Sequence, residues 1–279
     1  MKSVAIVGLG WLGYPLARHL RQMGWDVKGS KRTHEGVEQM RLERIQAYHL
    51  ELTPELNADP DDMAALLAAE ALVINIPPSR YFFSPRDYVQ SIRNLVSEAL
   101  LFSVNHIIFI SSVSVFPNVG GEFNEDSLPQ PDNDVGKALL EIEQRLLNLR
   151  DIDVDILRLA GLVGEDRHPV VHLAGKRNLP DGNVPVNLVH VDDCVRAIQL
   201  LLETSGARRL YHLVAPNHPV RAAYYRRMAK KLALSAPHFQ TTDNDVKRIV
   251  QGNKICRELG FIYQYPDPDD FTERTGPGG

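Results

Sequence analysis

The first thirteen residues constrain this chain more than any other stretch of its sequence. An apolar run, Val4–Val7, leads directly into glycines at positions 8, 10 and 13. Apolar residues at helical spacing follow, namely Leu12, Leu16, Ala17 and Leu20. Strand, glycine turn and helix in this order are typical of the first unit of a dinucleotide-binding sheet. The N–H groups and the positive end of the helix dipole would then face a pyrophosphate.

Each glycine of this turn has its own mechanical role. Gly8 allows the tight turn, Gly10 lets the backbone approach a pyrophosphate, and Gly13 lets helix and strand pack closely. Trp11 and Leu12 lie between them, and we expect all five residues to contact the cofactor. The alternative is an ordinary strand-to-helix turn that binds nothing.

Composition excludes several classes of function. A formal net charge of −4 gives no electrostatic footprint for nucleic acid, and no apolar run approaches the ~20 residues that cross a bilayer. The two cysteines, Cys194 and Cys256, are too few for a disulfide framework and favour a cytoplasmic location. The ten histidines are dispersed without ligand spacing, so we expect no metal site.

Apolar strands alternate with amphipathic helices through the first 160 residues. We expect strands at 25–29, 48–52, 71–76, 106–110 and 154–159, and helices at 34–46, 61–69, 87–101 and 134–149. Continuous Val, Ile and Leu runs indicate parallel strands that are buried on both faces. The sequence therefore predicts an α/β fold, with a Rossmann-type doubly wound parallel sheet over residues 1–163.

The pattern loosens after residue 163. Residues 164–186 form a loop-rich region, and strands are expected at 186–191 and 210–214. Helices are expected at 192–203, with Asp192 or Asp193 as the cap, at 222–234 and at 254–259. We predict a small mixed substrate lobe over 164–266, from which about 186–214 returns to the main sheet, and a frayed tail over 267–279.

The end of the second strand indicates which nicotinamide cofactor binds. An NAD site usually carries a carboxylate there for the ribose 2′-hydroxyl. This chain has Gly29-Ser30-Lys31-Arg32 instead, with a hydroxyl and two cations. Arg32 is able to hold a 2′-phosphate with two hydrogen bonds. The sequence thus favours NADP over NAD, with Ser30, Lys31 and Arg32 at the site, and solvated loop cations are the alternative.

Three longer motifs resemble a known superfamily. They are Ser111-Ser-Val-Ser-Val-Phe116, Arg158-Leu-Ala-Gly-Leu-Val-Gly164 and Asn187-Leu-Val-His-Val-Asp-Asp193. Together they resemble the extended short-chain dehydrogenase/reductases, the NAD(P)-dependent epimerase/dehydratase proteins, and specifically an atypical subgroup. The resemblance runs from Lys2 to about Pro268. It implies an oxidoreductase or epimerase/dehydratase acting on a sugar or nucleotide-sugar-like small molecule. It also implies that Ile76, Pro77, Ser111 and Leu162 contact the cofactor.

The resemblance transfers the catalytic residues only in part. Ser112 falls where the superfamily places a hydroxyl beside the reacting oxygen, and Ser114 is its neighbour. The superfamily's Tyr-x-x-x-Lys pair has no match in this sequence. One alignment places Val135 and Leu139 there, and the other places Asn133 and Lys137. Lys137 therefore stays a candidate for contact with the cofactor ribose or the substrate, and a solvated helix lysine is the alternative.

Further candidates lie beyond the sixth strand of the resemblance. Arg158 ends an apolar strand, and we expect a structural ion pair there rather than a role in the cleft. Arg167 and His168 fall where the superfamily receives substrate. His190, in a strand-to-helix corner, either binds substrate as an acid/base group or anchors the corner. Lys176 would suit an anionic substrate.

Two functions fit these features. The first is an NADP-dependent enzyme with altered acid/base residues, and the second is an NADP-binding sensor that does not turn over. The opening motif also resembles β-hydroxyacid dehydrogenases, but strands return in the second half, against that family's helical domain. A homodimer through the helices at 87–101 and 134–149 is left open, since leucines on their exposed faces are compatible with a four-helix contact.

Overall fold

The fold is described here from a computed structural model. It covers residues 2–78, 84–102, 104–164, 167–204, 206–240 and 246–272 of the 279-residue chain. None of the helices in these ranges is long and apolar enough to cross a membrane.

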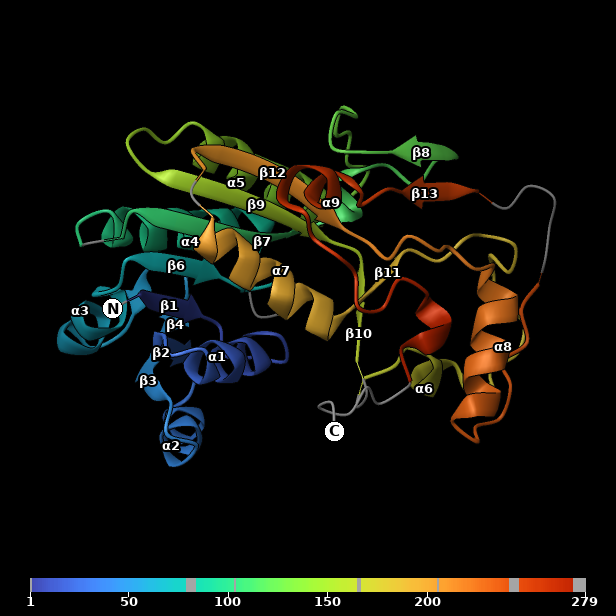
Figure 1. The fold of residues 1–279 in the computed structure, drawn as a ribbon, viewed down its shortest axis with the longest axis horizontal. Coiled ribbons are helices and arrows are strands. Elements are labelled where there is room, and N and C mark those ends of the chain that lie inside the picture. The colour runs from blue at the N-terminus through green and yellow to red at the C-terminus, as the bar shows by residue number, and fades with distance from the viewer. Residues whose placement is uncertain are drawn as a thin grey trace. The chain divides into compact units, whose positions relative to one another are not determined.

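The largest sheet of the described residues has seven strands (Figure 1). Its order is β12-β9-β7-β6-β1-β2-β3, and the pairs β1–β2, β1–β6, β2–β3 and β6–β7 are parallel. The strands are β1 (Ser3–Val7), β2 (Asp26–Lys31), β3 (Gln46–His49), β6 (Ala71–Ile74), β7 (His106–Ser112), β9 (Asp153–Leu159) and β12 (Arg208–Leu213). Strand order reverses between β1 and β6. Ligands of such sheets bind beyond the carboxyl ends of the strands at this point. The predicted Rossmann-type fold is confirmed.

Helices cover both faces of this sheet. Helices α1 (Gly13–Gln22) and α7 (Val191–Glu203) lie on one face, where His19 Nε2 and Gln199 Oε1 are 2.6 Å apart. Helices α4 (Pro85–Ala99) and α5 (Asp134–Leu147) pack side by side on the other. Helices α2 (His34–Leu42) and α3 (Pro60–Leu67) contact β3. The helix predicted over 34–46 ends early because Arg44 takes a left-handed φ of 60°.

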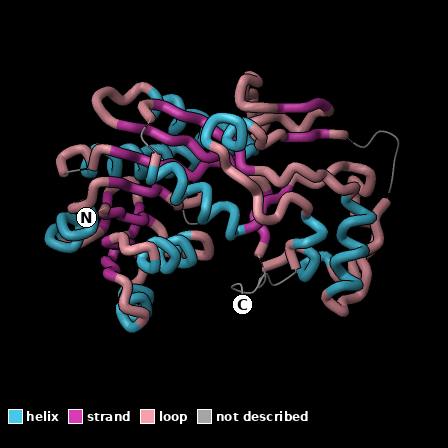
Figure 2. The backbone as a smooth tube through the Cα atoms, in the orientation of Figure 1, coloured by secondary structure: helices cyan, strands magenta, loops and turns pink. Residues whose placement is uncertain are grey.

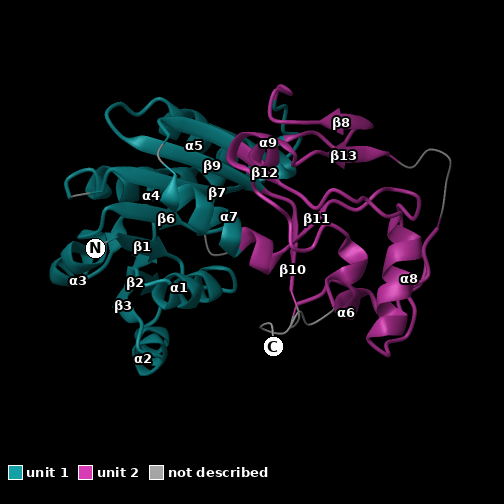
Figure 3. Cartoon of the chain, viewed as in Figure 1, with its two compact units in different colours: residues 1–115, 129–158, 195–210 teal, residues 116–128, 159–194, 211–279 magenta. Residues whose placement is uncertain are grey.

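The chain divides into two compact units (Figure 3). Unit 1 contains 1–115, 129–158 and 195–210, and unit 2 contains 116–128, 159–194 and 211–279. The predicted boundary at residue 163 thus falls near Leu159, where unit 2 resumes. Residues 116–128, expected in the first domain, belong to unit 2. Among the described residues of 186–214, β12 is the strand that joins the main sheet.

Loops and turns make up much of unit 2 (Figure 2). Its short elements are β8 (Gly121–Phe123), β10 (Gly161–Val163), α6 (Val170–Leu173), β11 (Leu188–His190), α8 (Arg221–Lys231), β13 (Arg248–Val250), α9 (Lys254–Leu259) and the 3-10 turn η2 (Pro268–Asp270). Strand β10 pairs with β11, and β13 pairs with β8. In unit 1, the hairpin β4 (Glu51–Leu52) and β5 (Leu56–Asn57) and the 3-10 turn η1 (Val113–Val115) complete the elements.

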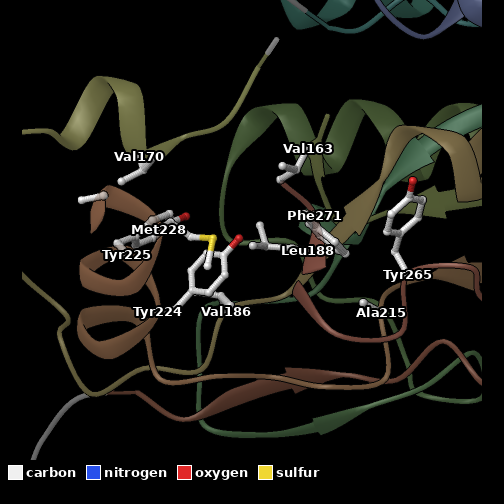
Figure 4. Close-up of a cluster of buried hydrophobic side chains, with 11 residues drawn as sticks. Val163, Val170, Val186, Leu188, Ala215, Tyr224, Tyr225, Met228, Tyr265 and Phe271 are labelled. Carbon is white, nitrogen blue, oxygen red and sulfur yellow. The ribbon is translucent and has the colours of Figure 1, made fainter. Parts of the chain in front are cut away.

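The C-terminal segment corrects one prediction. Residues 267–272 are folded into unit 2, where a frayed tail was expected. Asp267 accepts the Asp269 N–H at the start of η2, and Phe271 is fully buried. Figure 4 shows Phe271 with Leu188 and Tyr265 in the apolar cluster of this unit. Residues 273–279 lie outside the described ranges.

Candidate cofactor and active site

The glycine turn after β1 has the geometry that a dinucleotide cradle needs. Gly8 has a φ of +107°, and a Cβ there would lie 2.6 Å from the Asn75 carbonyl oxygen. A Cβ at Gly13 would lie 2.1 Å from the Gly8 oxygen, so neither position accepts a side chain. A Cβ at Gly10 would meet nothing within 4 Å, so the backbone there is open to a close ligand. Helix α1 begins after Leu12 without a side-chain cap. These features fit a pyrophosphate.

A residue outside the sequence prediction braces this turn. The Asn75 side-chain amide donates to the Gly8 carbonyl oxygen at 3.2 Å, and the Asn75 N–H donates to the Val7 oxygen at 2.9 Å. Asn75 therefore holds β1 to the end of β6 at the switch point. The signal was an amide at the end of the apolar run 71–76. Beyond it, Ile76 accepts the Tyr88 hydroxyl at 2.8 Å, and Pro77 is exposed.

The three candidate residues at the end of β2 differ in burial and in their contacts. Ser30 is buried, and its hydroxyl accepts the Gly8 N–H at 3.2 Å, which orients it toward the glycine turn. Lys31 is half-buried, and this burial lowers the pKa of its ammonium group. Arg32 is exposed. Ser30 therefore shapes the turn, while the two cations remain at the open edge of the sheet.

The serine motif lies at the carboxyl end of β7. The Ser111 hydroxyl donates to Glu143 at 2.5 Å and is buried. The Ser112 hydroxyl accepts the Ser114 N–H at 3.1 Å. The Ser114 hydroxyl is buried and has no hydrogen-bond partner among the described residues. Ser112 and Ser114 are thus close together, while Ser111 is engaged with helix α5.

A buried ion pair joins α5 to β9. Arg158 Nη2 lies 2.6 Å from Glu143 Oε2, and Arg158 Nε donates to both carboxylate oxygens at 3.0 and 3.2 Å. Both side chains are almost fully buried. Because each charge is buried against an opposite one, the predicted structural pairing of Arg158 is confirmed.

Helix α5 and its N-cap residue carry the residues that the two alternative alignments place at the Tyr-x-x-x-Lys positions. A Cβ at Gly136 would lie 2.4 Å from the Ser114 carbonyl oxygen, so the first turn of α5 lies against η1. Val135 is 40% exposed and Leu139 is buried. Lys137 is exposed and lies 3.3 Å from Asp134. It lines a groove of about 610 Å³ between α4 and α5, and the two candidate serines are not part of that lining.

The leucines of α4, α5 and the residues next to them are partly buried and partly exposed. Leu95, Leu139 and Leu146 are buried, whereas Leu100 and Leu101 are exposed. The homodimer through these helices therefore stays a prediction. The groove is lined mainly by polar and charged side chains, including Arg86, Gln90, Arg93, Asp134, Glu141 and Arg145.

Two histidines predicted to bind substrate are buried in unit 2. His168 Nδ1 accepts the Val170 N–H at 3.1 Å, and Nε2 lies 2.9 Å from the Tyr224 hydroxyl. Burial lowers the pKa of His168 to about 4. His190 Nδ1 accepts the Asp192 N–H at 3.2 Å, and its ring centroid lies 3.9 Å from that of Tyr265. Both rings are built into the packing of this unit.

The remaining predicted residues of unit 2 have different surroundings. Arg167 and Lys176 are exposed, and Leu162 lies in β10 beside Val189. Asp193, expected as a helix cap, is fully buried and accepts the N–H groups of Gln264 and Tyr265 at 2.7 and 3.0 Å. It therefore anchors the C-terminal segment. In the described part of the chain, no group of side chains has the arrangement of a metal site.

The fold and the glycine turn define a dinucleotide-binding α/β protein. The model of the NAD dependent epimerase/dehydratase family matches residues 4–213, and the chain belongs to this family. It is 47% identical to Protein YeeZ of Escherichia coli (strain K12) over 269 residues, which are 96% of this chain and 98% of the relative. The sequence resemblance is confirmed, and YeeZ typifies the subgroup to which it points.

Solved structures show the same fold at low identity. A conserved protein of unknown function from Silicibacter pomeroyi has a TM-score of 0.80 at 17% identity, covering 98% of this chain and 97% of that one. A UDP-glucuronic acid 4-epimerase from Bacillus cereus, in complex with NAD, has a TM-score of 0.79 at 19% identity, with 98% and 96% covered. At these identities the likeness shows the fold alone.

Proposed function

We propose that this protein binds NADP and acts as an oxidoreductase or epimerase/dehydratase on a nucleotide-sugar-like molecule. The observation that carries the cofactor choice is the end of β2, where Lys31 and Arg32 stand in place of a carboxylate. A carboxylate would repel a 2′-phosphate, whereas a guanidinium binds one with paired hydrogen bonds. The fit of the glycine turn to a pyrophosphate supports the same site.

Ser112 and Ser114 are the proposed groups at the reacting oxygen. A bound nicotinamide supplies hydride chemistry. The two hydroxyls would donate hydrogen bonds to a substrate oxygen and so orient and polarise it. The buried Ser114 hydroxyl supports this role, because a buried polar group without a partner is costly unless a ligand satisfies it.

The missing Tyr-x-x-x-Lys pair limits the chemistry that we propose. No tyrosine occurs between Tyr88 and Tyr211, and neither Val135 nor Leu139 can carry a proton. We propose that water carries the proton, away from the substrate hydroxyl in oxidation and to the carbonyl oxygen in reduction, at a lower rate than a phenolate would give. The exposure of Lys137 and its pairing with Asp134 argue against a part in this step.

The second candidate function is an NADP sensor that does not turn over. The missing dyad favours it, because binding needs only the glycine turn and the end of β2. The two functions differ in one observable. Both bind NADPH, but only the enzyme oxidises it when a keto-sugar nucleotide is added.

The first test is calorimetric titration of the wild type, Arg32→Ala and Gly10→Val with NADPH and NADH. We expect tighter NADPH binding in the wild type and a loss of about 10- to 100-fold for NADPH in Arg32→Ala, since one charge-assisted contact contributes about 1.5–3 kcal/mol. Gly10→Val should fold normally but bind neither cofactor, because its side chain occupies the open face of the turn.

Arg93→Ala is the matched control, because this exposed arginine lies on α4. Equal affinity for NADH and NADPH, or undiminished binding by Gly10→Val, would contradict the assignment. A cytoplasmic location and a homodimer stay predictions.

A further inference from the structure

We propose that His34 and His49 form a proton-linked part of the 2′-phosphate subsite, so that NADP(H), unlike NAD(H), binds with proton uptake. This inference rests on the proposed function. It adds two residues that determine cofactor specificity and a pH dependence that belongs to one cofactor alone.

The two imidazoles stack at the carboxyl edge of the sheet. His34 is the first residue of α2 and His49 the last of β3. Their ring centroids are 4.2 Å apart and the ring planes differ by 20°. In the parallel ladder between β2 and β3, His49 is in register with Lys31. The pair therefore lies beside the cations proposed to hold the phosphate.

The hydrogen bond of His49 shows which nitrogen titrates. Its Nε2 lies 2.9 Å from the carbonyl oxygen of Arg32. Because a carbonyl oxygen only accepts, Nε2 carries the hydrogen, and a proton gained on acidification enters at Nδ1. The same bond ties the His49 ring to the backbone of Arg32, so the ring and the guanidinium share one short stretch of chain.

A bound 2′-phosphate would change the charge around the pair. Each imidazolium would repel the other ring's charge and the cations of Lys31 and Arg32. A 2′-phosphate carries about −1.5 to −2 charges near neutrality and would reverse this balance. The other charged groups on the elements of the pair and on those packed against them are Asp26 and Lys28 on β2, Glu35, Glu38 and Arg41 on α2, and Asp61 and Asp62 on α3. Glu51 follows His49 by two residues.

Proton linkage follows from this change. A histidine with an ordinary pKa near 6.5 titrates where its neighbours can shift it across neutrality. If the phosphate raises that pKa, the NADPH complex holds protons that the free protein lacks. The affinity for NADPH then rises as the pH falls from about 8 to about 6.5. NADH has no 2′-phosphate, so its affinity does not rise as the pH falls.

The test is calorimetric titration with NADPH and NADH at about pH 8 and about pH 6.5, each in two buffers of different ionisation enthalpy. The proteins are the wild type, the double variant His34→Gln/His49→Gln, and the single variant His34→Gln. His34 is exposed, so the single variant should fold even if the double variant does not. His172→Gln is the control, because this histidine is exposed on α6.

We expect the ratio of NADPH to NADH affinity to rise about three- to tenfold on acidification in the wild type and in His172→Gln. The rise should shrink in His34→Gln and vanish in the double variant, together with the proton uptake. The 2′-phosphate of free NADPH also titrates near pH 6, but this contribution of the free ligand is the same for every protein tested. Equal pH dependence for both cofactors, or the same rise in the histidine variants, would overturn the inference.

Failure of the two proposals gives different results. Tight NADPH binding that needs Arg32 but shows no pH-dependent ratio overturns only the role of the histidines. No preference for NADPH at either pH overturns the cofactor assignment and this inference together.

Discussion

Charged side chains at the amino ends of β7, β9 and β12 are mostly buried, whereas those at the carboxyl ends of β2 and β3 are half-buried or exposed. At the amino ends of β7, β9 and β12, Asp155 is fully buried and accepts two hydrogen bonds from Arg209 at 2.6 Å each. His106 Nε2 lies 2.7 Å from the same carboxylate. At the carboxyl ends of β2 and β3, Lys31, Arg32 and the stacked histidines are half-buried or exposed. The charges at one end are buried with their partners, whereas those at the other end are half-buried or exposed.

This difference separates structural from functional charge. A buried carboxylate whose partners are all protein groups stabilises the fold, and removing one partner leaves an uncompensated charge. Exposed cations at a strand end add little to stability, and for Lys31 and Arg32 we propose contact with a ligand instead of a structural role. The same criterion places Arg158 and Glu143 with the structural group, although they lie near the serine motif.

Removing the buried carboxylate should have the largest effect. We expect Asp155→Ala to lower the free energy of unfolding by about 3–5 kcal/mol, because Arg209 and His106 lose their shared partner. Chemical denaturation measures this, and Asp155→Asn, which keeps the shape and one acceptor, should lose less. A loss below about 1 kcal/mol in Asp155→Ala would mean that the network is not structural.

The buried His168 should make unfolding depend on pH. Its folded pKa of about 4 lies below the ordinary 6.5, so the unfolded chain binds the proton more readily between these values. The free energy of unfolding should therefore fall as the pH drops from about 6.5 to about 4, by up to about 3 kcal/mol. Above about pH 6.5 this contribution is fully present.

Denaturation of the wild type and His168→Gln across this range tests the slope. Burial also lowers the pKa of His218, so part of the pH dependence should remain in the variant. An unchanged slope would show that His168 titrates in the folded protein much as it does in the unfolded chain.

Removing the exposed lysine of α5 should have the smallest effect. We expect Lys137→Ala to change the free energy of unfolding by less than about 0.5 kcal/mol, since its pair with Asp134 is exposed. NADPH affinity should also stay unchanged. A loss of binding or turnover in this variant would restore Lys137 to the site and weaken the distinction between the two groups of charges.

Strands and helices could be predicted wherever the apolar residues repeat with one clear spacing. The apolar strands β1, β6, β7 and β9 and the amphipathic helices α1, α4 and α5 were predicted because a buried strand or a one-sided helix leaves a clear pattern. The short pairs β10–β11 and β13–β8 were not, since three residues carry no period. Phe271 was missed because one aromatic among prolines and aspartates gives little signal of burial.

Site residues could be predicted where the backbone geometry accepts only one type of residue. Gly8 and Gly13 are required by contacts that no side chain could share. The substrate roles of His168 and His190 stay predictions, because a histidine in a sequence does not reveal whether its ring faces a cleft or a core. Asn75 was missed for a similar reason, since its partner, the Gly8 carbonyl, is 67 residues away.

The buried pair of Asp155 and Arg209 has a consequence for synthesis on the ribosome. The two residues are 54 positions apart, which takes about 3 to 11 s to translate at about 5–20 residues per second. During that time Asp155 has His106 as a partner but lacks Arg209, so burying its carboxylate at this edge of the sheet would leave the charge only partly compensated. We expect the nascent chain to keep β9 exposed until β12 emerges, and this interval is when chaperones would matter most.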